Sequence, residues 1–146
     1  MIAAALLVLG MARADTVLNL GDRPTVVAFV GAEQQEIMYS ADWARVLYAF
    51  KPELDAARPA LEKLPVVVRE VYSPTILFRS RGREWHLEPD PASLLSGYYL
   101  WSPEGPRYLC RGAMKKDALL STVTAFLGQV RSGTDGELAG CEQARP

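Results

Sequence analysis

Apolar residues gather first in an unbroken run that predicts a strand at the centre of a sheet. Residues 25–30 (TVVAFV) are β-branched, small or aromatic, and they stand between Pro24 and Gly31. A continuous apolar run of this length favours a strand that is buried on both faces, as central parallel strands are. A second apolar run at residues 66–71 (VVVREV) predicts another strand.

The segment between these two runs has helical spacing. Ser40 is a candidate N-cap, and the apolar residues behind it recur at helical intervals: Trp43, Val46, Leu47 and Phe50. We predict that Lys51-Pro52 interrupts this helix and that a second piece starts at Pro52, with Pro59 as a kink. That piece carries one apolar side before Pro65 stops it: Leu54, Ala57, Leu61 and Leu64.

Two hairpins and a helix are predicted for the remainder. Residues 75–78 and 83–87 flank a turn at 79–82, and residues 98–101 and 107–110 flank a second turn at 102–106. The clearest helix follows Gly112, begins near 115–117 and ends at Gly133. One side of it is apolar: Leu119, Val123, Phe126, Leu127 and Val130.

This order of elements predicts an α/β sandwich with a mixed central sheet and helices on its faces. The first two strands are joined through a helix, so we expect them to be parallel, and the hairpins to add antiparallel strands at one edge. We expect a single domain over residues 15–131 and a loose C-terminal tail over residues 132–146.

Composition narrows the function classes. The chain has 16 Lys and Arg against 17 Asp and Glu, a net charge of −1. Nucleic-acid-binding proteins usually carry a basic excess, so we expect no nucleic-acid partner. One His and two Cys are too few for a structural zinc site of four such ligands. No glycine pattern of a phosphate or dinucleotide site is present, so we expect no metal and no cofactor.

The N-terminus resembles an export signal. Residues 2–11 (IAAALLVLGM) are apolar or small and precede Ala12-Arg13-Ala14, which predicts a signal peptide over residues 1–14 and cleavage before Asp15. The run is too short to cross a bilayer, so we expect a periplasmic or secreted protein without a transmembrane helix. No Lys or Arg precedes the run, which leaves the true translation start open. The alternative is a buried N-terminal helix or strand.

Export would make the two cysteines a pair. An even number of cysteines in an oxidising compartment usually forms disulfides, and Cys110 and Cys141 allow one connectivity. We expect this bond to tie the C-terminal tail to the sheet. The alternative is two free thiols in a cytosolic protein.

The order of these segments resembles the thioredoxin-like superfamily, in particular its exported thiol-disulfide proteins. Residues 20–32 (LGDRPTVVAFVGA) resemble the strand that leads into the family's active site, and residues 73–78 (SPTILF) resemble its cis-proline strand, with Pro74 as the candidate. Residues 105–127 resemble the family's last hairpin strand and closing helix. The resemblance implies a thioredoxin-like sandwich with a C-terminal hairpin and helix.

The chain departs from the family where its chemistry resides. Members carry Cys-x-x-Cys at a helix N-terminus, where the helix dipole lowers the pKa of the thiol. Residues 32–36 here are AEQQE, without sulfur, and Glu33 and Glu36 would raise the pKa of any nearby thiol. This excludes a thioredoxin-type mechanism at that place.

Two hairpins compete for the family's terminal position. If Pro74 is the cis-proline, the second hairpin is an insertion; if the second hairpin is terminal, Pro74 is an ordinary proline. We favour the second hairpin because it leads directly into the last helix.

The first hairpin carries a candidate binding face. Arg79, Arg81 and Arg83 alternate along it, with Trp85 two places on, so we expect their side chains on one face of the sheet. Such a face could bind an acidic partner or a phosphate. The alternative is a soluble hairpin tip whose charges block aggregation.

Other candidate sites favour a structural interpretation. His86, the only histidine, lies on a hairpin strand without a nucleophile turn anywhere in the chain, so we expect a half-exposed sheet residue and no catalytic residues. An aromatic set marks the second hairpin: Tyr98, Tyr99, Trp101 and Tyr108. We expect alternate members to face the core and the others to be available as a contact patch.

Together these features predict an exported, redox-inactive thioredoxin-like binding or assembly module whose partner is another envelope protein. One alternative is an envelope thiol enzyme that uses Cys110 or Cys141. Another is a small inhibitor or immunity-type protein.

Overall fold

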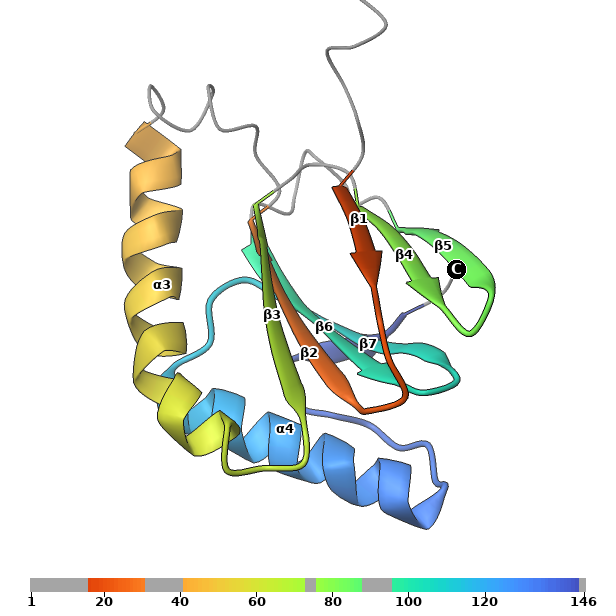
Figure 1. The fold of residues 1–146 in the computed structure, drawn as a ribbon. Helices are drawn as coiled ribbons and strands as arrows, with labels where there is room; N and C mark the ends of the chain where they lie inside the picture. Colours follow the sequence, from red (N-terminus) through yellow and green to blue (C-terminus); the bar gives the residue numbers. More distant parts are fainter. Residues whose placement is uncertain (1–15, 31–40, 73–75, 88–95, 145–146) are drawn as a thin grey trace, which may run out of the picture.

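The computed structural model describes residues 16–30, 41–72, 76–87 and 96–144, which form an α/β structure with two helices and two mixed sheets (Figure 1). The elements are β1 Thr16–Asn19, β2 Thr25–Val30, α3 Ala41–Leu61, β3 Val67–Tyr72, β4 Ile76–Ser80, β5 Arg83–Leu87, β6 Ser96–Ser102, β7 Gly105–Arg111, α4 Lys116–Ser132 and β8 Cys141–Gln143. The predictions for the signal peptide, residues 32–36 and Pro74 lie outside the described residues.

The larger sheet has five strands in the order β3-β2-β6-β7-β8. β2 has the predicted bounds and lies at the interior, parallel to β3 and antiparallel to β6. β3 begins one residue later than predicted. The second hairpin, β6–β7, and the helix α4 are confirmed, with longer strands than the sequence indicated. Gly133 ends α4 in the left-handed conformation (φ 67°), as its position after the apolar stripe predicted.

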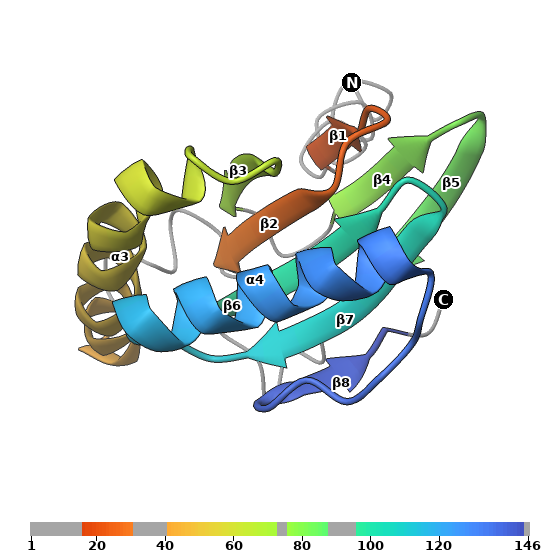
Figure 2. The same cartoon turned by 90° about the horizontal axis from the view of Figure 1, so that it is seen from below.

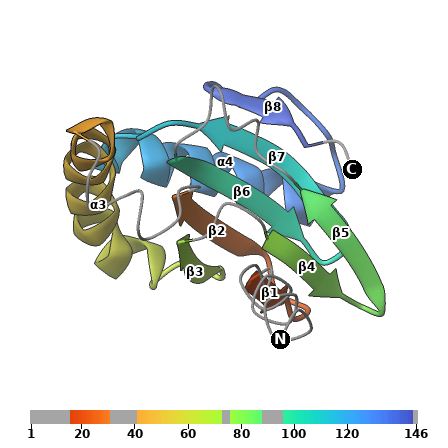
Figure 3. The same ribbon diagram turned by 90° about the horizontal axis from the view of Figure 1, so that it is seen from above.

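The first hairpin belongs to a second sheet, which corrects the prediction of one sheet. β4 and β5 pair with β1 in the order β1-β4-β5, and β1 runs parallel to β4. Figure 3 shows this small sheet lying to one side of β2 and β6. The strand β1 was not predicted, because a four-residue segment of mixed polarity has no clear signal of its own.

The two faces of the larger sheet are covered by different layers. One face packs against both helices through side chains such as Leu54 and Phe126 (Figure 2). The other face packs against the smaller sheet, where Phe78 and Trp85 meet Tyr99 and Trp101. Both described helices thus lie on one face, and in the described part of the chain the other face is covered by the hairpin that we had assigned to the sheet edge.

α3 is one helix that continues through both of its prolines, which corrects the predicted interruption at Lys51-Pro52. Proline removes a backbone hydrogen bond and usually kinks or ends a helix. Here the apolar stripe crosses the site without a break, since Phe50, Leu54, Ala57 and Leu61 are at most 1% exposed. Tertiary packing of this stripe outweighs the lost bond.

The C-terminal segment is tied to the larger sheet, as predicted, and it also forms the strand β8, which was not predicted. The predicted disulfide is present: Cys110 in β7 and Cys141 in β8 are bonded, with an S–S distance of 2.06 Å. Leu138 is buried in the helix-side core, and Arg111 in β7 pairs with Glu142 in β8 at 2.7 Å. The segment thus adds an edge strand to the larger sheet.

Tyr108 in β7 connects the C-terminal segment to α4 through its buried side chain. Its hydroxyl contacts the side chain of Gln129 in α4 and the backbone of Gly136. Arg107 adds an ion pair to Asp135. The predicted contact patch on the second hairpin is therefore wrong, because Tyr98, Tyr99, Trp101 and Tyr108 are all at most 3% exposed. Both faces of β6 are covered, and no aromatic side chain of this set reaches solvent.

Tyr98 offers a direct test of this packing. Its hydroxyl is buried and has no hydrogen-bond partner among the described residues, whereas that of Tyr108 has two. An unpaired buried hydroxyl costs about 1–3 kcal/mol. We expect Tyr98→Phe to raise the free energy of unfolding by about 1 kcal/mol and the control Tyr108→Phe to lower it by a similar amount. Urea unfolding at neutral pH measures both, and equal losses in the two variants would contradict the assignment.

The pH dependence of stability at alkaline pH gives a second test of the buried tyrosines, here Tyr98 and Tyr99. Burial raises the pKa of Tyr98 and raises the pKa of Tyr99 to about 12. The unfolded chain releases its phenolic protons near pH 10, two units earlier than folded Tyr99. Between these values the unfolded state binds fewer protons, so stability falls as the pH rises from about 10 to about 12. Tyr98→Phe should reduce this loss.

Candidate functional site

The tip of the first hairpin is a two-residue turn. Ser80 pairs with Arg83, which leaves Arg81 and Gly82 as the central residues with φ values of 51° and 74°. Two successive left-handed residues are typical of the turn that fits the twist of a hairpin. The turn is therefore shorter than the predicted 79–82, and Arg81 projects from its tip.

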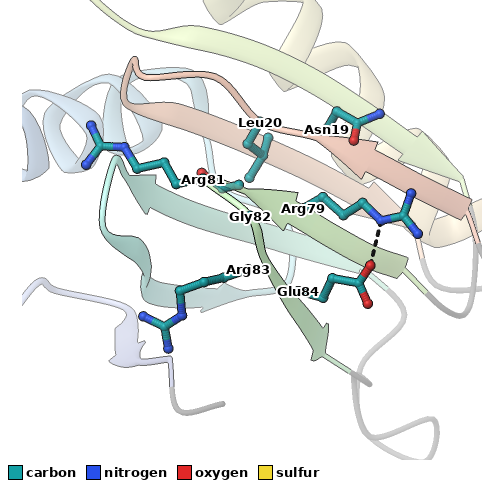
Figure 4. A pocket seen from close by; sticks show the side chains of 8 residues that line it. Asn19, Leu20, Arg79, Arg81, Gly82, Arg83 and Glu84 are labelled. Atoms are coloured by element: carbon teal, nitrogen blue, oxygen red, sulfur yellow. Dashed lines mark hydrogen bonds and ion pairs between the residues drawn. The ribbon is translucent and has the colours of Figure 1, made fainter.

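This turn corrects the prediction that the arginines share one face. Directly paired residues of an antiparallel hairpin point to the same side, and Arg79 pairs with Glu84 while Ser80 pairs with Arg83. Arg79 and Arg83 therefore lie on opposite faces of the small sheet. Figure 4 shows Arg79 directed toward Glu84, with Arg81 and Arg83 on the other side. The prediction assumed that every second side chain points to the same face of the sheet. This holds within one strand, but across a two-residue turn Arg79 and Arg83 point to opposite faces.

Trp85 is a core residue and not an exposed part of a binding face. It is 6% exposed, and its ring meets Trp101 edge to face with the ring centroids 5.3 Å apart. Gly105 makes room for it, since a Cβ there would lie 3.2 Å from the indole. The guanidinium of Arg83 lies over this indole, 5.0 Å from the ring centroid. Trp85 thus supports Arg83 from below by a cation–π contact.

The hairpin borders a depression in the surface. A hollow of about 350 Å³ is lined by Arg79, Arg81, Arg83 and their neighbours together with Asn19 and Leu20 (Figure 4). A second hollow of about 130 Å³ shares Asn19 and Leu20 and adds Arg23 and Arg69. We refer to the arginines of both hollows as the arginine surface: Arg23, Arg69, Arg79, Arg81 and Arg83.

Two of these arginines have carboxylate partners. The Arg79 Nε atom lies 2.8 Å from Glu84, and the Arg81 Nε atom lies 3.0 Å from Asp22. All four side chains are at least half exposed, and ion pairs in that setting contribute at most about 1 kcal/mol. Both pairs can therefore exchange for a partner's carboxylate at little cost.

The other three arginines have no carboxylate within ion-pair distance in the described part of the chain. The Arg69 Nη1 atom lies 3.5 Å from the backbone carbonyl of Asn19, and Arg83 makes the contact with Trp85. The arginine surface therefore carries five positive charges against two negative ones, in a chain whose net charge is −1.

Arg81 of this surface also acts on Glu104, in the turn of the second hairpin. A hydrogen bond from Ser102 and a backbone hydrogen bond lower the pKa of Glu104, and the positive charges of Arg81 and Arg107 lower it further. Glu104 is ionised at neutral pH and interacts electrostatically with Arg81 of the arginine surface.

Arg23 and Arg69 were not among the binding residues predicted from the sequence. They are 46 positions apart, and only the pairing of β2 with β3 brings them together: Thr25 pairs with Val67, and the Val67 N–H donates to the carbonyl of Pro24 at 2.9 Å. Two polar residues, Arg69 and Glu70, interrupt the apolar run at residues 66–71, and an exposed Arg in such a run indicates where the strand meets solvent.

The remaining sequence candidates do not assemble a second site. His86 lies in β5 opposite Leu77, and its side chain is outside the described residues. No group of three His, Cys, Asp and Glu side chains able to hold a metal ion is present in the described ranges. Neither described helix has an apolar stretch long enough to cross a membrane.

A scan against models of protein families, a search of curated proteins and a search of solved structures each gave no match to this chain.

Proposed function

We propose that this protein is an exported, redox-inactive member of the thioredoxin-like superfamily that acts as a binding or assembly module. The order of elements supports the fold assignment. The unit β2–α3–β3 supplies two parallel strands, and β6–β7–α4 supplies a hairpin and a closing helix beside them in the order β3-β2-β6-β7. The resemblance implies this combination. The smaller sheet, in place of a helix, is this chain's departure from it.

This topology favours the second hairpin as the family's terminal one. β6 pairs directly with β2 and β7 leads into α4, whereas the first hairpin lies in the other sheet. On this assignment Pro74 precedes a strand outside the thioredoxin-like core and is not in the cis-proline place.

The observation that carries the proposal is the position of the sulfur atoms. Residues 32–36 contain no cysteine, and the two cysteines of the chain are bonded to each other between β7 and β8. Cys110 is 1% exposed and Cys141 is half-buried, so a dithiol can approach the bond only from the side of Cys141. A disulfide in this place is structural, and it also favours an oxidising compartment.

The alternative of a thiol enzyme is tested by counting thiols. We expect no free thiol to react with a thiol reagent in the native protein, and two after reduction in denaturant. Insulin reduction in the presence of dithiothreitol should proceed at the rate without protein. The Cys110→Ser/Cys141→Ser variant is the matched control. Turnover above background that disappears in this variant would overturn the proposal in favour of the enzyme.

A further inference from the structure

We propose that the arginine surface binds an extended acidic segment of a partner protein, through side-chain carboxylates. This inference deepens the proposed binding function by naming the chemistry of the partner. It rests on Arg23, Arg69 and Arg83, for which the described residues provide no carboxylate within ion-pair distance, and on the two hollows that they line.

The chemistry of the surface favours carboxylates. Guanidinium groups can form two parallel hydrogen bonds with a carboxylate. Two arginines of the site already pair with carboxylates, each through a single contact of its Nε atom: Arg79 with Glu84 at 2.8 Å and Arg81 with Asp22 at 3.0 Å. Asp22 is 82% exposed, so its contact with Arg81 is held loosely and can exchange for a carboxylate of a partner. Arg83 is different, because its guanidinium lies over the buried indole of Trp85, and this contact restricts the exposed side chain before a partner binds.

The shape of the surface favours an extended segment over a compact anion. The two hollows adjoin at Asn19 and Leu20, so the five arginines lie along a path, with Arg79 and Arg83 on opposite sides of the hairpin, and do not converge on one point. A single phosphate would reach only part of that path. Asp22 and Glu84 interrupt the positive charge and would repel a continuous anionic surface such as a membrane, whereas a peptide can place its carboxylates between them.

An apolar contact lies next to this path. Val17 is 43% exposed, and it is the one large hydrophobic side chain that is exposed in the described part of the chain. It stands in β1 two residues before Asn19, on the same face of the strand. A partner segment that combines carboxylates with one apolar side chain therefore fits this surface.

Binding can be measured with a defined probe. We would titrate the disulfide-bonded protein into a fluorescein-labelled peptide that alternates glutamate with serine and contains one valine, and follow the fluorescence anisotropy. The peptide with glutamine in place of glutamate is the control. We expect saturable binding of the acidic peptide only, weakened when the ionic strength rises from about 0.05 to about 0.15 M, because exposed ion pairs are screened.

The variant Arg23→Gln/Arg69→Gln/Arg83→Gln tests the residues. Each exposed ion pair contributes roughly 0.5 kcal/mol, so the loss of three ion pairs with the peptide should raise its Kd about tenfold. The matched control is Lys63→Gln/Lys115→Gln/Arg131→Gln, which removes the same charge from exposed positions elsewhere. It should bind as the unaltered protein does. Circular dichroism checks that both variants keep the fold.

Three results would overturn the proposal. They are equal weakening in both triple variants, absence of binding to the acidic peptide, and binding of inorganic phosphate or of phosphatidylglycerol vesicles in its place. None of them restores dithiol chemistry, so redox inactivity stands or falls separately with the thiol count and the insulin assay.

Discussion

Replacing Cys110 and Cys141 by serine is expected to lower the free energy of unfolding by about 3–4 kcal/mol. The disulfide closes a loop of 31 positions, and closing such a loop removes conformational entropy from the unfolded chain by roughly this amount. The native contacts of β8, including Arg111–Glu142 and the buried Leu138, are made by other groups and remain. The variant should therefore fold to the same structure with a lower Tm.

Reductant separates the bond from the substitutions. Under dithiothreitol the unaltered protein should converge on the Tm of the double serine variant, whose own Tm should not change. Differential scanning calorimetry with and without reductant measures this. Equal Tm values for the oxidised protein and the variant would show that the bond contributes nothing. Binding of the acidic peptide should persist in the variant, because β7 and β8 lie outside the arginine surface.

Gly97→Ala is expected to cost about 3 kcal/mol, because the strand β6 has no room for a methyl group there. A Cβ at Gly97 would lie 2.5 Å from the carbonyl oxygen of Cys110 and 3.1 Å from the ring of Phe29. The first contact is with backbone, which cannot rotate away, so the pairing of β6 with β7 must shift. Overpacking of this kind costs typically 1–3 kcal/mol and occasionally more.

Gly128→Ala is the matched control with the opposite sign. It makes the same chemical change inside α4, where nothing lies within 4 Å of the added atom. Alanine in a helix interior is more favourable than glycine by about 0.5–1 kcal/mol. Urea unfolding should show one variant destabilised and the other stabilised. A neutral Gly97→Ala would mean that β6 and β7 can separate at this point without loss.

The elements that were predicted correctly from the sequence are those marked by their own residues and their immediate neighbours in the chain. β2 was delimited correctly because Thr25 and the five apolar residues after it stand between Pro24 and a glycine, and both faces of the strand are in fact covered. α4 was delimited by its apolar stripe and by Gly133, whose left-handed conformation ends the helix. These features act within one turn or one strand, so the sequence alone contains them.

The parts that it did not predict depend on partners distant in the chain. β8 is three residues long and mostly polar, and it is a strand only because β7 accepts it, the disulfide holds it and Leu138 anchors it. The first hairpin looked like an edge addition because its own pattern does not say which sheet it joins. Its Phe78 and Trp85 are apolar in either case, and only the opposing Tyr99 and Trp101 decide that it forms a layer.

The candidate site divides in the same way. Arg79, Arg81 and Arg83 were found because they are close in sequence, but their faces were misjudged because a two-residue turn reverses the alternation. Arg23 and Arg69 join them only through the pairing of β2 with β3. Trp85 was read as part of an exposed face, although the packing of two sheets buries it beneath Arg83.

The C-terminal segment, residues 133–144, also affects solubility. A shortened chain that stopped after Ser132 would make β7 an edge strand, with unpaired amide and carbonyl groups along one side. Such an edge strand can pair with the same strand of another molecule and lead to aggregation. β8 replaces this edge with a strand of three residues, too short to recruit another copy, and Glu142 and Gln143 are exposed on it. The same residues that complete the core thus also keep neighbouring molecules apart.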